Sequence, residues 1–135
     1  MNKLILALAI APALMTTGAF AQTVSDDVTK ELWCGTALVV AFGAAPSDAT
    51  AEQLAMAKTY LDGGNHLIDE ATQKHLDAGF TEEQVTKVKT DLVAEITPVV
   101  TGDGSGAKYS FEDCAALVPQ PAAPSSEAPS SSSAN

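Results

Sequence analysis

The chain contains two cysteines, Cys34 and Cys114, which lie 80 positions apart near the two ends of its patterned region. In an oxidising compartment two thiols usually pair. Closing a loop of this length stabilises a fold by about 4–5 kcal/mol on the chain-entropy model. The alternatives are two separate buried thiols or a redox pair, but the Cys-x-x-Cys spacing of a redox site is absent. We therefore predict a structural disulfide that holds the end of the fold against its beginning.

The N-terminal segment predicts export into such a compartment. Lys3 gives a positive start, residues 4–14 form an apolar run, and residues 19–21 supply the small-x-small pattern of a cleavage site. The run is shorter than the ~20 residues that span a bilayer and contains Pro12, which argues against an uncleaved anchor. We predict a signal peptide over 1–21, cleavage between Ala21 and Gln22, and a periplasmic or secreted protein without stable membrane insertion.

The mature chain is predicted to hold one helical domain over 22–118 and a disordered tail over 119–135. The tail contains four prolines, many serines and no large apolar side chain, so it has little to bury. Without the signal peptide the chain carries six lysines, no arginine and 17 carboxylates, a net charge of −11. Because such a surface repels phosphate backbones and anionic lipids, we expect no nucleic-acid partner.

Apolar residues recur at helical spacing through the whole domain. Ser25 is a candidate N-cap, and a stripe from Val28 to Phe42 predicts a central helix that Gly43 and Pro46 end. Over 49–78 small residues recur every seven positions, at 57, 64, 71 and 78, which is typical of closely packed helices. The adjacent glycines at 63 and 64 either split this region into 49–62 and 65–78 or lie within one helix, which the unbroken phase favours.

Two further helices follow from capping signals. Gly79 is expected to close the preceding helix, and Thr81 with Gln84 forms a capping box for a helix whose apolar face runs up to Pro98. After a glycine-rich loop, a second capping pattern begins a short helix over 111–118. The fold class is therefore all-α, a small bundle of four to five helices closed by one disulfide.

His66 and His75 are the only histidines, and with Glu70 they are the only candidate metal ligands. His66 and Glu70 are four residues apart and share a helix face. The nine-residue separation of the histidines places them on opposite sides of a straight helix, at ~100° per residue. We therefore interpret both as solvent-facing side chains on an acidic helix and predict no metal site and no cofactor.

Catalytic motifs are also missing from the sequence. The glycines before Lys108 do not form a phosphate-binding loop, because Tyr109 stands where a metal-binding hydroxyl is needed. No nucleophile elbow, His-Glu-x-x-His pair or dinucleotide-binding glycine pattern occurs. Neighbouring carboxylates on a helix point in different directions and do not form an acid–base pair. We expect a protein that is not an enzyme.

Three functions remain open. The first is an envelope protein-interaction module, suggested by the apolar face of residues 32–42 and the small-residue stripe, which could also support self-association.

The second is an acid- or envelope-stress chaperone. In general shape, as an exported helical chain with one disulfide, the protein resembles the small acid-activated periplasmic chaperones, with which it shares no motif. Its carboxylates would lose their charge near about pH 4. The third is a small-ligand or metal carrier, since helical bundles house such sites.

Overall fold

The computed structural model describes residues 22–119, and over this range the chain forms four α-helices and no strand. The predicted all-α bundle is confirmed. The predicted signal peptide over 1–21 lies outside the described residues, as does the predicted tail except for Pro119. The helices are α1 (Asp26–Phe42), α2 (Ala51–Asp77), α3 (Glu82–Thr101) and α4 (Phe111–Ala115).

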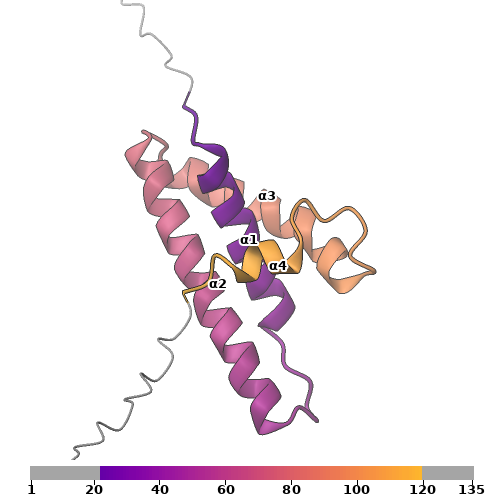
Figure 1. The fold of residues 1–135 in the computed structure, drawn as a ribbon. Helices are drawn as coiled ribbons and strands as arrows, with labels where there is room; N and C mark the ends of the chain where they lie inside the picture. The colour runs from indigo at the N-terminus through magenta and orange to yellow at the C-terminus, as the bar shows by residue number, and fades with distance from the viewer. Residues whose placement is uncertain (1–21, 120–135) are drawn as a thin grey trace, which may run out of the picture.

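Helix α1 is the centre of the bundle. It packs along α2, against α3 on another side, and under the short α4 (Figure 1). Surrounded in this way, the seven consecutive residues Leu32–Leu38 are all buried. The helix begins at Ser25, whose hydroxyl accepts the Val28 N–H, and ends at Gly43, as the sequence predicts.

Helices α1 and α2 meet through two glycines, Gly35 and Gly64. A Cβ atom added to Gly35 would lie 2.7 Å from the Gly64 carbonyl oxygen, and one added to Gly64 would lie 2.9 Å from the Gly35 carbonyl oxygen. No side chain fits between the two backbones at this point. Two members of the small-residue stripe, Gly64 and Ala71, are buried inside the molecule, whereas Ala57 is partly exposed and Ala78 is exposed.

Helix α2 is continuous through Gly63 and Gly64, as the unbroken phase favours. It is 27 residues long and begins with a capping box formed by Thr50 and Gln53. The chain leaves the helix through Gly79, whose φ of +91° is a left-handed conformation that glycine adopts without strain. The predicted capping box of Thr81 and Gln84 then begins α3.

The predicted end of α3 at Pro98 is wrong. The helix continues for one turn, to Thr101, with Pro98 inside it. A proline in a helix removes one backbone hydrogen bond. Packing compensates for this loss, because Ile96 is fully buried and Val100 packs against the core.

The predicted helix over 111–118 is too long, since α4 covers only Phe111–Ala115. The next residues form turns, in which the N–H groups of Leu117 and Val118 donate to carbonyls three residues earlier. Val118 is still buried, because its side chain lies on Gly63 of α2. The predicted disulfide is present: the sulfur atoms of Cys34 and Cys114 are 2.03 Å apart, and both residues belong to the core.

We expect Gly64→Ala to lower the free energy of unfolding by about 2 kcal/mol, as measured by urea denaturation. Overpacking typically costs about 1–3 kcal/mol. The added methyl group would press on the backbone of α1, which cannot move aside as a side chain does. This cost exceeds the ~1 kcal/mol that alanine gains over glycine in helix propensity.

Gly63→Ala provides the matched control, because the atoms that its methyl group would meet belong to the Val118 side chain. In a double-mutant cycle, Val118→Ala should offset the loss caused by Gly63→Ala and leave that caused by Gly64→Ala unchanged. A Gly64→Ala protein as stable as the parent would contradict the close backbone contact.

Candidate functional site

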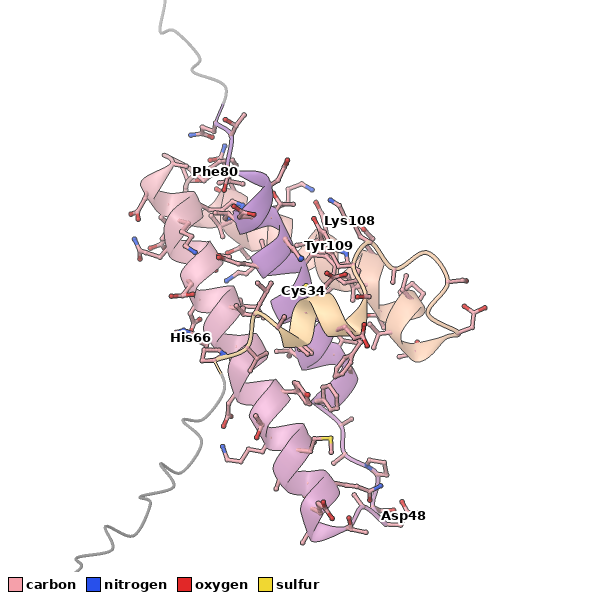
Figure 2. All side chains as sticks on the ribbon, in the orientation of Figure 1. Cys34, Asp48, His66, Phe80, Lys108 and Tyr109 are labelled. Atoms are coloured by element: carbon pink, nitrogen blue, oxygen red, sulfur yellow. A yellow bond between two sulfur atoms is a disulfide. The ribbon has the colours of Figure 1, made fainter. Side chains whose placement is uncertain are left out.

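The candidate metal ligands do not converge. His66 Nε2 lies 3.7 Å from a carboxylate oxygen of Glu70, and both side chains are about half exposed. Figure 2 shows His66 on α2, well away from Phe80 at the far end of that helix. Phe80 packs edge-on against His75, with ring centroids 5.2 Å apart. Among residues 22–119, no three His, Cys, Asp or Glu side chains are arranged to hold a metal ion.

The interpretation of His75 as solvent-facing is wrong. Its side chain is only 4% exposed, and its Nδ1 lies 2.6 Å from the Ala71 carbonyl oxygen. His75 lies one turn beyond Ala71, on the side of α2 that the bundle covers. The acidic sequence around it gave no sign of this, because burial depends on the position of neighbouring elements.

One end of the molecule carries an aromatic cluster in which two rings are partly buried and one is exposed. Phe42 stacks on Tyr60 at a centroid distance of 5.0 Å, and Phe111 lies 5.2 Å from Tyr60 and 6.2 Å from Phe42. Phe111 remains 53% exposed. The three rings come from α1, α2 and α4, so the cluster exists only when these helices are assembled.

A pocket of about 460 Å³ adjoins this cluster, between the end of α1, the 43–50 loop and the start of α2. Phe42 lines it together with Met56, which is 54% exposed, and Pro46 and Asp48 of the loop. We call Phe42, Met56, Tyr60 and Phe111 the aromatic end. Figure 2 shows Asp48 on the loop beside the start of α2.

Carboxylates outnumber ammonium groups around the aromatic end. Residues 41–57 contain Asp48 and Glu52 and no lysine, and Phe111 is followed directly by Glu112 and Asp113. The next lysine along α2, Lys58, is paired with Asp62 one turn later. The aromatic end is therefore an apolar surface with an acidic border.

A second pocket, of about 340 Å³, lies beside the disulfide, and we call it the disulfide pocket. It is bounded by α1, the end of α3, the loop after α3 and α4. Its lining includes Trp33, Val99, Val100, Tyr109, Phe111 and Cys114. Trp33 Nε1 is buried and donates no hydrogen bond to any atom of the described chain. An unsatisfied buried donor of this kind costs about 1–3 kcal/mol.

Two ion pairs join α1 to its neighbours. Lys74 of α2 lies 2.6 Å from Glu31, and this hydrogen bond raises the pKa of Lys74 above its ordinary value. Lys30 lies 3.5 Å from Asp113 of α4. Asp113 also accepts hydrogen bonds from the Ser110 hydroxyl and N–H. The Ser110 bonds, followed by the charge of Lys30, lower the pKa of Asp113.

None of the helices in the described range has the length and apolar composition needed to cross a membrane. Comparison with protein-family models, curated proteins and solved structures finds no match to this chain. The functional argument therefore depends on the geometry of the aromatic end and the disulfide pocket.

Sequence reasoning missed both surfaces. It placed Phe42 in the apolar stripe of the central helix and did not single out Phe111, which is 53% exposed. It also based the interaction hypothesis on the 32–42 face, of which residues 32–38 are buried, and on the small-residue stripe, of which Gly64 and Ala71 are buried. The one usable signal was Phe111, a large apolar side chain at the first position of a short, acidic helix.

We expect Asp113→Asn to reduce the loss of stability in acid. Because the pKa of Asp113 is lower in the folded protein, its contribution is fully present above its ordinary value of 3.8 and is lost as the pH falls through the folded value. The urea concentration at the midpoint of unfolding should change little between pH 7 and pH 5. Below pH 5 it should fall, and the fall should be less steep in Asp113→Asn than in the parent protein.

Glu95→Gln is the control, because this exposed carboxylate makes no hydrogen bond or ion pair with another described side chain. It should preserve the acid sensitivity of the parent protein. Identical acid profiles for Asp113→Asn and the parent would contradict the role given to Asp113.

Proposed function

We propose that the protein is an exported, non-enzymatic interaction module whose aromatic end binds a cationic amphipathic helix of another envelope protein. The observation that carries this proposal is the exposure of Met56 and Phe111 beside a concave, acid-bordered pocket. Aromatic residues and methionine are enriched at protein interfaces, where they fill pockets on the partner or receive its anchors.

The shape of the site favours a helical partner. Amphipathic helices bind apolar grooves through side chains spaced three or four residues apart. The loop pocket could receive one such side chain, and the aromatic cluster provides an adjoining apolar surface. The acidic border favours lysine or arginine on the polar side of the partner, since complementary charge guides association and selects partners.

Export is part of the same proposal. It is supported by the leader-like N-terminal sequence and by a disulfide in the core, a bond that persists in oxidising compartments. The aromatic end needs no metal or cofactor for this role, and the proposal assigns the protein no reaction.

An acid- or envelope-stress chaperone is a second candidate, favoured by the position of Asp113. Protonation of this residue weakens its capping of α4 and its ion pair with Lys30. Loosening of α4 about its disulfide anchor would expose apolar side chains of α1 that line the disulfide pocket. This candidate requires that the protein suppress aggregation of client proteins at pH 2–3 and fails if clients aggregate equally without it.

Mass spectrometry of the native protein tests export. We expect a chain that begins at Gln22 and is lighter than the reduced chain by two hydrogens, because signal cleavage and disulfide formation both accompany export. An intact Met1 with two free thiols would refute export.

Binding is tested with two synthetic helical peptides that share one apolar pattern and differ in charge, one rich in lysine and one rich in glutamate. We expect the mature, disulfide-bonded protein to bind the lysine peptide at least tenfold more tightly in fluorescence anisotropy, with affinity that falls as salt rises. Met56→Gln and Phe111→Gln should each weaken binding roughly tenfold, because each removes apolar contact area.

Val93→Gln is the matched control, since Val93 is 46% exposed but lies on α3 and lines neither pocket. It should leave the affinity unchanged. Equal binding of both peptides, or equal losses in all three variants, would refute the assignment to the aromatic end. Sedimentation of the protein alone distinguishes self-association from binding to a different protein.

A further inference from the structure

The disulfide pocket is bounded by four separate parts of the chain. Helices α1, α3 and α4 and the loop after α3 each contribute to its lining. Figure 2 shows Tyr109, one of the lining residues, at the loop that leads into α4. The pocket volume of about 340 Å³ lies near the lower end of the range that small-molecule sites occupy. Its size and its walls therefore suit a small molecule.

Charged side chains are absent from the described residues that line this pocket. The Ser110 hydroxyl belongs to a lining residue, but it donates to the Asp113 carboxylate and accepts the Asp113 N–H. The Trp33 indole N–H is enclosed by protein atoms and is closed to a ligand. Two lysine ammonium groups lie near the Tyr109 ring, but neither lysine lines the pocket. Because an ion that leaves water without a partner loses its hydration uncompensated, the lining favours an uncharged ligand.

Three aromatic side chains line the pocket, and they come from different elements. Trp33 belongs to α1, Tyr109 to the loop after α3 and Phe111 to α4. The Trp33 and Tyr109 rings meet nearly edge to face, at 5.4 Å and 76°. Aromatic rings attract one another in edge-on and offset stacked arrangements. A rigid aromatic ligand can use this preference, and it loses less conformational freedom on binding than an alkyl chain does.

We propose that the disulfide pocket binds a small, uncharged aromatic molecule. Its rings replace water against the apolar lining, and the burial of apolar surface supplies the affinity. This proposal does not rest on the peptide-binding role, because it requires no charge on the ligand and its test changes no residue of the aromatic end. Failure of either experiment therefore leaves the other interpretable.

Two dyes with the same ring skeleton test the charge requirement. N-phenyl-1-naphthylamine is uncharged, 8-anilinonaphthalene-1-sulfonate carries a negative charge, and both emit more strongly in apolar surroundings. The mature, disulfide-bonded protein is titrated with each dye. We expect a saturable rise in emission with the uncharged dye and an affinity at least tenfold weaker for the sulfonate, because the lining offers no cation to replace its hydration.

Substitutions in two walls of the pocket locate the dye. Ala107→Phe adds a bulky side chain at an exposed loop position, and Val99→Gln adds an amide to the lining. Each should weaken binding of the uncharged dye at least tenfold, since the first takes up space and the second removes apolar contact area.

Each variant has a matched control. Val93→Gln serves for Val99→Gln, because Val93 lies on the same helix but lines neither pocket. Ala45→Phe serves for Ala107→Phe, because Ala45 is exposed and lines the pocket that adjoins the aromatic end. Both controls should leave the affinity for the uncharged dye unchanged.

Thermal unfolding of each variant establishes that the fold is retained. The absence of a saturable response to the uncharged dye would overturn the proposal, as would equal affinities for the two dyes. Loss of binding in Ala45→Phe but not in Ala107→Phe would place the dye beside the aromatic end and would also overturn it. Equal affinities in Val99→Gln and Val93→Gln would refute the assigned contact with the end of α3.

Discussion

The close contact between Gly35 and Gly64 determines where the other parts of this molecule lie. With the backbones of α1 and α2 touching, Trp33 lies on another side of α1, where it packs against Tyr109 and lines the pocket bounded by α3 and α4. The same crossing aligns residues on either side of it. Phe42 follows Gly35 by two turns and Tyr60 precedes Gly64 by about one, and their rings stack at the resulting end of the helix pair.

The disulfide supplies the second constraint, because α4 could not hold its position alone. A helix of five residues is far below the length at which helices are stable in isolation. Cys114 fixes it on α1 beside Gly35, and the Lys30–Asp113 pair adds a weaker contact. The loop that the disulfide closes spans 80 residues, so its loss would affect the whole chain as well as α4.

The sequence predicted the helices better than the surfaces, for a physical reason. Caps and turns are local, so Thr81 with Gln84 and the exit at Gly79 could be identified correctly. Where packing overrides a local preference, as at Pro98, or buries a polar residue, as at His75, the prediction failed. The small-residue stripe predicted a close helix contact, but periodicity does not say whether the contacting helix belongs to the same chain. The aromatic end and the disulfide pocket join side chains from separate helices, so only the assembled fold shows them.

Both surfaces depend on α4. Phe111 contributes to the aromatic end and also lines the disulfide pocket, while Cys114, one turn later, anchors the helix. A change that displaces α4, such as disulfide reduction, therefore alters both surfaces together. Substitution of Met56 leaves α4 anchored and affects the aromatic end alone. This distinction separates variants that report on a binding site from variants that report on the fold that builds it.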